Sequence, residues 1–513
     1  MTAQPLFVRA AAAADRVAVT APDGVFHYRD LLDASATAAS RLLAGAPDLR
    51  EARVAFLVPP GFAYVAVQWG IWRAGGVAVP LAVSHPQAEL AYVVGDSGAS
   101  VIIAHPELAD RVAPIADAGG LRLILTTDVL VPAGADDPAA PDAAPDAAPG
   151  GAPALPALDA ERRAMILYTS GTTSRPKGVV TTHGNLAAQV STLVAAWGWE
   201  PSDHILLILP LHHVHGIINV LTCALWSGAH VTILPRFDAD QVWDVIASGQ
   251  LTLFMAVPTI YTRLITAWEA APPERQQAMS AGCRTLRLMV SGSAALPVSV
   301  LERWRAISGH TLLERYGMTE IGMALSNPLD GPRRPGAVGT PLPGVTVQLV
   351  DEEGRAVAPG TPGEIEVRGP SVFQEYWGKP EATRAAFREG WFRTGDIAVA
   401  EEGAYRILGR SSVDIIKTGG YKLSALEIEE ALLAHPQIAE CAVVGIPDPT
   451  WGERVGAAVV LRPGAQLTLD TLRHWAADHL APYKLPTRLL TLTELPRNAM
   501  GKVVKPDLVG FFH

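Results

Sequence analysis

The chain has 513 residues, of which 49% are hydrophobic and 18% charged, so it can form several folded units with large cores and is unlike a disordered protein. Lys and Arg number 41 against 51 Asp and Glu, a formal charge of −10, which argues against a nucleic-acid partner. The cysteines at 223, 283 and 441 are too few and too scattered for a disulfide framework or a structural zinc site.

Short apolar runs bounded by Gly and Pro alternate with amphipathic stretches through the first 300 residues, a pattern typical of buried parallel strands and covering helices. The expected strands are residues 54–58, 101–103, 121–125, 165–167, 205–209, 231–234 and 286–290, and the expected helices include 89–96 and 241–247. Residues 131–160 are almost entirely Ala, Pro, Gly and Asp, and we expect a flexible acidic insertion there. The sequence predicts two mainly parallel α/β subdomains.

From about residue 336 the pattern changes to strands joined by Gly-containing turns, at 345–350 and 363–369, which predicts an antiparallel β subdomain. A break follows at 409–414. Beyond it we expect a helix at 424–434, strands at 440–445 and 456–461, and a helix at 469–480. The predicted domains are therefore a large one, residues 1–410, and a small mobile α/β one, residues 411–513.

The segment from Tyr168 to Gly178 follows an expected strand and combines several hydroxyls with glycines, an Arg and a Lys. Such a loop offers the hydrogen-bond donors that a polyphosphate requires. It is not a Walker loop, because Lys177 precedes the last Gly and no Ser or Thr follows in register. The composition alone fits an ordinary polar surface turn equally well.

The loop resembles the phosphate-binding signature of the adenylate-forming superfamily, which comprises acyl-CoA synthetases, luciferases and peptide-synthetase adenylation domains. Further signatures follow in the same order over about residues 28–505: 315–320 resembles the adenine and magnesium segment, 392–396 the ribose segment, 409–420 the hinge and 496–502 the catalytic-lysine segment. One departure is Ser174, where the superfamily loop usually has the more flexible Gly.

The resemblance implies ATP, Mg²⁺ and coenzyme A as ligands. The implied ATP-binding residues are Thr169, Ser170, Gly171, Thr172, Thr173, Lys177, Gly178, Tyr316, Gly317, Thr319, Asp396, Arg410 and Lys502. The implied catalytic residues are Lys502, Glu320, Thr169 and His213, with Glu320 and Thr169 as the magnesium ligands. The implied hinge and coenzyme A residues are Ser412, Asp414, Gly419, Gly420 and Lys422.

Each of these residues taken alone has a plainer interpretation. Glu320 supplies a hard oxygen that suits Mg²⁺, but a lone Glu is more often an exposed or capping carboxylate. Asp396 is placed in a turn, where Asp commonly bonds its own backbone, and a lone Lys such as Lys502 is most often a solvated surface residue. Only the ordered set of signatures favours the functional interpretation.

Three histidines in the segment 210–216 suggest a metal site, and on a strand His213 and His215 would share a face. No Cys or carboxylate lies close in sequence to complete a ligand shell, so a polar lining for an acid pocket is the favoured interpretation. This segment, with 255–261, 291–294 and 335–339, resembles more narrowly the malonyl-CoA synthetases.

A substrate with two carboxylates needs a cationic or strongly donating partner for the second one. Arg236, directly after an expected strand, is the first candidate, with Ser291 and His213 as additional donors and Arg284 and Arg287 as backups. The alternative for Arg236 is a surface residue paired with Asp238 or Asp240.

The resemblance thus predicts a ligase that activates malonate through an acyl adenylate and forms malonyl-CoA, with small molecules as its partners and a monomer or weak dimer as its state. The alternatives are a ligase for methylmalonate or another short or medium-chain acid, an adenylating enzyme that acylates a carrier protein, and a regulatory protein that only binds nucleotide. No apolar run reaches the ~18 residues of a membrane span. We expect a cytoplasmic protein, with an organelle-targeting segment in the Ala-rich residues 1–14 as the alternative.

Overall fold

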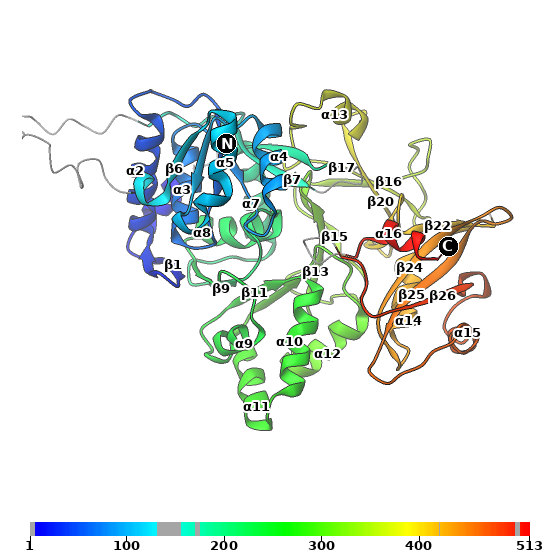
Figure 1. Ribbon diagram of the computed structural model, residues 1–513. Coiled ribbons are helices and arrows are strands. Elements are labelled where there is room, and N and C mark those ends of the chain that lie inside the picture. Colours follow the sequence, from blue (N-terminus) through cyan, green and yellow to red (C-terminus); the bar gives the residue numbers. More distant parts are fainter. Residues whose placement is uncertain (1–5, 131–154, 170–174, 420, 498–502, 513) are drawn as a thin grey trace, which may run out of the picture.

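The computed structural model describes residues 6–130, 155–169, 175–419, 421–497 and 503–512, which form four β-sheets and their covering helices (Figure 1). The first two sheets are largely parallel and the last belongs to a separate C-terminal unit, so the predicted α/β class is confirmed. No helix in these ranges is long and apolar enough to cross a lipid bilayer.

The first sheet has seven strands and contains the predicted phosphate-loop hairpin. Its order is β18 (Glu375–Tyr376), β8 (Lys177–Thr182), β7 (Arg163–Thr169), β4 (Val77–Pro80), β3 (Arg53–Leu57), β5 (Val101–Ala104) and β6 (Arg122–Leu125). The helices of this region are α1 (Leu6–Ala12), α2 (Tyr28–Leu43), α3 (Phe62–Arg73), α4 (Gln87–Ser97), α5 (Ala109–Gly119) and α6 (Thr126–Val129). A Cβ on Gly70 would lie 2.4 Å from the Cβ of Ala38, so a glycine permits the close approach of α3 to α2.

The second sheet has nine strands and its central six are parallel. Its order is β15 (Thr340–Pro341), β14 (Gly322–Ser326), β13 (Leu313–Met318), β12 (Leu288–Ser291), β11 (Leu253–Ala256), β9 (His204–Leu207), β10 (His230–Ile233), β1 (Val17–Ala21) and β2 (Gly24–His27). The strands from β13 to β1 in this order are parallel, so the carboxyl ends of β9 to β13 meet at one edge, where open α/β sheets bind ligands.

Helices cover the second sheet, and four of them project together to one side (Figure 1). The helices are α7 (His183–Ala196), α8 (Cys223–Ser227), α9 (Ala239–Ala247), α10 (Pro258–Ala270), α11 (Pro273–Gly282) and α12 (Val298–Ser308), of which α9 to α12 form the projection. The Val, Ile and Leu side chains of the parallel strands are buried among them, which explains why these strands are continuously apolar in sequence.

The third sheet is antiparallel, which confirms the change of pattern predicted after residue 336. It contains β16 (Thr346–Val350), β17 (Gly363–Arg368), β20 (Trp391–Glu401) and β19 (Phe387–Arg388), with β21 (Ala404–Arg410) also paired to β20. The short helix α13 (Pro380–Ala386) precedes β19.

The fourth sheet belongs to the C-terminal unit, which stands beside the third sheet in orange and red (Figure 1). It contains β23 (Tyr421–Ser424), β22 (Ile415–Thr418), β25 (Gly452–Leu461), β24 (Ile438–Asp448) and β26 (Arg488–Leu492), with helices α14 (Ala425–Leu433), α15 (Leu469–Ala476) and α16 (Lys505–Gly510). Its apolar side chains form cores of their own. The predicted elements are present, although α15 ends at Ala476 rather than at residue 480.

Candidate active site

A buried cation lies at the carboxyl edge of the second sheet. Arg315 of β13 is only 3% exposed, and its Nε has no hydrogen-bond partner among the described residues. Burial lowers its pKa to about 9, so the guanidinium is still charged at neutral pH. An uncompensated buried charge costs several kcal/mol, so this site favours an anionic ligand.

Hydroxyl and imidazole groups surround the Arg315 guanidinium. The Ser293 hydroxyl lies 3.4 Å from a terminal nitrogen of Arg315 and 3.3 Å from Nδ1 of His215. Ser291, at the end of β12, is fully buried, and its hydroxyl also has no hydrogen-bond partner among the described residues. The Ser293 hydroxyl therefore lies beside the cation. Ser291 pairs in register with Glu314, and because side chains alternate along a strand, its hydroxyl is on the opposite face of the sheet from Arg315.

Gly292 makes this arrangement possible. A Cβ at Gly292 would lie 2.6 Å from the guanidinium carbon of Arg315, so any larger residue would displace the cation. The next residue, Ser293, has a φ of 71°, which is an unfavourable backbone conformation for a residue other than glycine. Strain of this kind is typical of residues held in place at functional sites.

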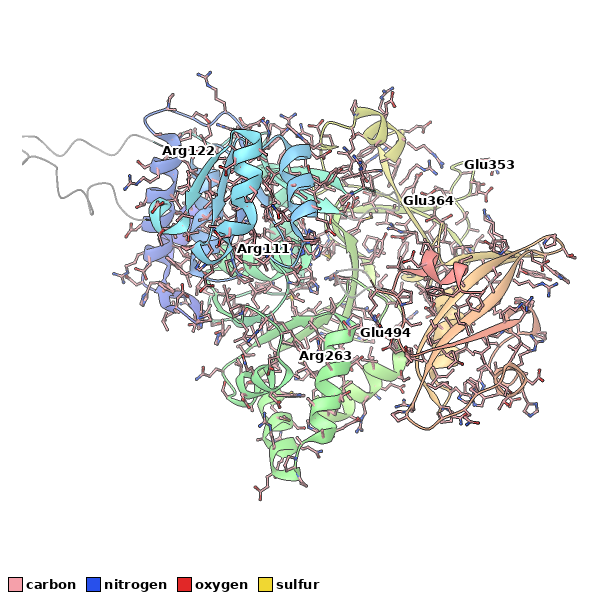
Figure 2. The ribbon with its side chains drawn as sticks, in the orientation of Figure 1. Arg111, Arg122, Arg263, Glu353, Glu364 and Glu494 are labelled. Carbon is pink, nitrogen blue, oxygen red and sulfur yellow. The ribbon has the colours of Figure 1, made fainter. Side chains whose placement is uncertain are left out.

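A second cluster starts at the next residue of β13. The Tyr316 hydroxyl donates to Oδ2 of Asp396 at 2.6 Å, and Arg410 Nε donates to Oδ1 at 3.0 Å. Glu364, labelled in Figure 2, accepts the Gly395 amide at 3.2 Å and so supports the turn before Asp396. Each Asp396 oxygen retains a second lone pair, with which it can accept a further hydroxyl.

Glu320 lies near this cluster and is 5% exposed. Its Oε1 accepts a hydrogen bond from the Tyr376 hydroxyl at 3.0 Å, and burial raises its pKa above the usual value for Glu. The Tyr376 ring lies 4.9 Å from Lys177 Nζ. Within the described ranges no three His, Cys, Asp or Glu residues gather as a metal shell. Glu320 by itself offers the hard carboxylate oxygens that Mg²⁺ accepts as ligands.

The hairpin of β7 and β8 brings Thr169 opposite Lys177 and Tyr168 opposite Gly178. The predicted phosphate-binding residues Ser170, Gly171, Thr172 and Thr173, and also Ser174, lie outside the described residues. Gly317 directly follows Tyr316, and Thr319 lies two residues beyond Gly317. A Cβ on Gly317 would lie 2.1 Å from the Gly322 carbonyl oxygen, so the close pairing of β13 with β14 requires a glycine there.

The histidines do not lie on a strand, so the expected shared strand face of His213 and His215 is wrong. Residues 210–214 form a turn, and a π-helical segment, His215–Thr222, follows it. Burial lowers the pKa of His212 to about 3 and that of His215 well below the usual range, so both rings are neutral at pH 7. The His213 ring packs against that of His212, with centroids 4.1 Å apart and the ring planes tilted by 50°.

The structure does not bring Arg236 to the buried cation site. Arg236 is exposed after β10, three strands away from β12, or about 14 Å at the usual strand spacing. Arg284 is also exposed, and Arg287 is paired with Asp203 at 2.5 Å. The sequence motif places the segment of Arg315 in the nucleotide site only, because the adjacency of β12 and β13 is not readable from local sequence.

The predicted hinge is held by a network around Asp414. Its Oδ2 accepts the Arg410 amide at 3.0 Å, and its Oδ1 lies 2.5 Å from Nζ of Lys505, which also contacts Glu429 at 2.7 Å. A Cβ on Gly409 would lie 2.3 Å from the Asp414 Cβ, and the φ of Gly409 is +128°. Glycine is therefore required at the start of this turn.

A cavity of about 360 Å³ adjoins the hinge. Its lining residues are Thr394, Gly395, Arg410, Ser411, Ser412 and Lys417. Lys422 pairs with Glu352 at 2.6 Å, and the Gly419 amide donates to the Trp451 carbonyl at 2.9 Å. The predicted residues Gly420 and Lys502 lie outside the described residues.

Comparisons with known proteins agree with this geometry. The AMP-binding enzyme family matches residues 6–377, and the AMP-binding enzyme C-terminal domain matches residues 427–502. The mitochondrial malonate–CoA ligase ACSF3 of Mus musculus is 49% identical, over 98% of this chain and 90% of its own length.

Two solved structures are similar over nearly the whole chain. ATP-bound MatB from Rhodopseudomonas palustris has a TM-score of 0.87 at 35% identity, covering 99% of this chain and 98% of its own. A malonyl-CoA ligase in a ternary product complex with methylmalonyl-CoA and AMP has a TM-score of 0.67 at 38% identity, covering 96% of this chain and 100% of its own.

Proposed function

The chain belongs to the AMP-binding enzyme family, and from that premise we propose that it is an ATP-dependent acid–CoA ligase that converts malonate into malonyl-CoA through an acyl adenylate. ATP and coenzyme A are its co-substrates, and AMP and pyrophosphate are its products. The relatives that carry the name malonate–CoA ligase support this choice of acid.

The observation that carries the choice of a diacid is the burial of Arg315. A monocarboxylate carries one negative charge, which lies at the reacting end next to the nucleotide. It has no second charge to compensate the buried Arg315 guanidinium. Malonate has a second carboxylate two carbon–carbon bonds away from the first. We assign that distal carboxylate to Arg315, with the Ser293 hydroxyl as a further donor.

In the first step, an oxygen of the reacting carboxylate forms a bond to the α-phosphorus, and the bond from that phosphorus to the pyrophosphate oxygen breaks. This reaction requires mainly positioning and charge neutralisation. Asp396 binds the ribose hydroxyls, while Thr169 and Lys177 stand at the ends of the loop that receives the phosphates. Lys502 supplies a positive charge between the carboxylate and the α-phosphate. Mg²⁺, held by Glu320 and Thr169, would neutralise the phosphate oxygens.

In the second step, the coenzyme A sulfur bonds to the acyl carbon, and the carbon–oxygen bond to AMP breaks. We propose that residues 411–513 turn about Asp414 relative to residues 1–410, so that Gly419, Gly420 and Lys422 replace Lys502 at the site. The TM-scores support two arrangements, because the chain matches the ATP-bound neighbour at 0.87 but the product complex at only 0.67, despite the higher identity of the latter.

The test is ATP–pyrophosphate exchange with malonate, methylmalonate, acetate and octanoate, each followed by a thioester assay with and without coenzyme A. We expect exchange with malonate and a coenzyme A-dependent thioester. Exchange with acetate or octanoate but not malonate would contradict the diacid assignment. Acyl transfer only to a carrier protein, or nucleotide binding without any exchange, would favour the other two classes.

Methylmalonate is the second candidate acid, because a similar solved structure holds methylmalonyl-CoA and AMP. A methyl group on the central carbon leaves both carboxylates in place, so Arg315 would bind it in the same way. The cytoplasmic location and the monomer or weak dimer stay predictions, and the mouse relative is named as mitochondrial.

A further inference from the structure

One carboxylate on helix α4 joins three elements around the β7–β8 hairpin. Asp96 Oδ2 accepts a hydrogen bond from the Tyr168 hydroxyl at 2.8 Å, and its Oδ1 pairs with Lys379 Nζ at 2.9 Å. Tyr92, one turn earlier on α4, donates to the Pro176 carbonyl at 2.8 Å, and its hydroxyl lies 3.4 Å from Asp96. The last two turns of α4 therefore contact β7 and the residue that precedes β8.

The contacted residues adjoin the two proposed phosphate-binding residues. Tyr168 directly precedes Thr169, and Pro176 directly precedes Lys177, which is the cross-strand partner of Thr169. A Cβ on Gly178 would lie 3.1 Å from the Tyr168 ring, so the absence of a side chain there lets the ring lie across the hairpin. Tyr168 is thus placed between a glycine on one strand and a carboxylate on the helix.

The ion pair extends the same network to the proposed magnesium residue. Lys379 lies three residues beyond Tyr376, whose hydroxyl donates to Glu320, and β18 itself pairs with β8. The side chains of Asp96 and Lys379 are 17% and 31% exposed, so water screens this pair less than an ordinary surface pair. A hydrogen bond to an ionised carboxylate is also stronger than one between neutral groups.

We propose that Asp96 is a positioning residue for the adenylation step, which fixes Thr169 and Lys177 on either side of the nucleotide phosphates through Tyr168, Tyr92 and Lys379. The inference rests on the proposed function and extends it to a residue about 70 positions before the phosphate loop. Asp96 itself touches no reacting atom. Its loss therefore acts through the placement of the hairpin, and a shift of about 1 Å at such a site can cost about 100-fold in rate.

The test compares Tyr168→Phe, which removes only the hydroxyl, with Asp96→Ala in the full-length protein. For both we expect the KM for ATP in malonate-dependent exchange to rise about tenfold or more, with the KM for malonate within about twofold. Thioester formation from supplied malonyl adenylate should stay within about twofold, because that reaction needs no triphosphate. The double variant should be no worse than Asp96→Ala, because the second change removes a bond already lost.

The matched control is Glu89→Gln on the same helix, where the carboxylate pairs with His85 at 3.2 Å and faces no part of the hairpin. We expect this variant to match the unmodified protein in every assay. The inference would be overturned if Asp96→Ala had a lower melting temperature but an unchanged KM for ATP, or if it lost activity equally in both half-reactions. Asp96 would then be only a structural contact. An unmodified protein without malonate-dependent exchange would instead overturn the proposed function itself.

Discussion

Two consecutive residues of β13 divide the site between its two ligands. Arg315 lies beside β12 and is the proposed partner of the distal carboxylate, while Tyr316 contacts Asp396, the proposed ribose-binding residue. The preceding residue, Glu314, is also buried, and burial raises its pKa to about 8, so it is largely neutral at pH 7 and does not cancel the guanidinium charge.

Glu320→Gln tests the magnesium assignment at the residue scale. The amide has the same size and can still accept the Tyr376 hydroxyl, so the fold should persist, but it carries no charge for Mg²⁺. We expect the Mg²⁺ concentration for half-maximal pyrophosphate exchange to rise about tenfold and the maximal rate to fall about 100-fold. A Mg²⁺ titration of exchange measures both, and an unchanged midpoint would contradict the assignment.

The structure brings predicted nucleotide residues together but does not bring Arg236 to the buried cation site. Tyr316, Asp396 and Arg410 occur in three separate segments, and the structure brings them together. Arg236 follows an expected strand, but the order of strands in a sheet is not readable from local sequence. Only the adjacency of β12 and β13 places Arg315 against Gly292 and Ser293.

At the scale of elements, the C-terminal helix is attached to the hinge by one buried cation. Lys505 begins α16, is 8% exposed and lies between Asp414 and Glu429. The neighbouring carboxylates raise its pKa against the opposing effect of burial, so it stays charged. Lys505, three residues after Lys502 in the chain, thus contacts the proposed pivot, Asp414.

Lys505→Met should destabilise the protein strongly, because it leaves two carboxylates near each other in a buried site without a cation. The expected loss is about 3–5 kcal/mol, as for other broken buried ion pairs. Lys422→Met is the matched control, because its pair with Glu352 is exposed and screened by water, and we expect no resolvable change in stability. Urea unfolding followed by intrinsic fluorescence measures both, and equal small losses would contradict the expectation.

Several imidazoles make the stability depend on pH. Burial lowers the pKa of His183 and His230 to about 4 and that of His212 to about 3, below the value near 6.5 of an unfolded chain. Between about pH 6.5 and 4 the unfolded chain therefore takes up protons that the folded chain excludes, and stability falls as the pH falls.

The melting temperature measured at steps from pH 7.5 to 4.5 should decline below about 6.5. In His230→Gln the decline should be shallower, because one imidazole no longer contributes to the difference in bound protons. Thr20 and the stacked His204 surround this ring, and glutamine can still bond the Thr20 hydroxyl. An identical slope in both proteins would contradict the role of His230.

At the scale of the whole molecule, the site lies where three sheets and the hinge meet. The first sheet supplies the hairpin, the second supplies Arg315 and Tyr316, and the third supplies Asp396. Periodicity and turn residues predicted most strands, because buried parallel strands are continuously apolar. They did not predict the turn that holds His213, because its conformation depends on packing between distant segments. They also did not predict where the insertion ends, because Leu155, inside the expected range 131–160, packs on the main core.

Lys502→Ala tests whether the two half-reactions use different groups. We expect exchange with pyrophosphate to fall by about 1,000-fold or more, because the charge between carboxylate and α-phosphate is lost. Thioester formation from supplied malonyl adenylate should remain within about threefold of the unmodified protein. Loss of both half-reactions in a protein with an unchanged melting temperature would contradict the separate roles.

The central claim is that Arg315 holds the distal carboxylate of a short diacid. The most direct measurement is kcat/KM for malonate and for propionate in pyrophosphate exchange, in the unmodified protein and in Arg315→Met. We predict that the substitution lowers the value for malonate about 100-fold or more while the value for propionate changes less than about threefold. An equal fall for both acids, or an undiminished preference for malonate, would contradict the claim.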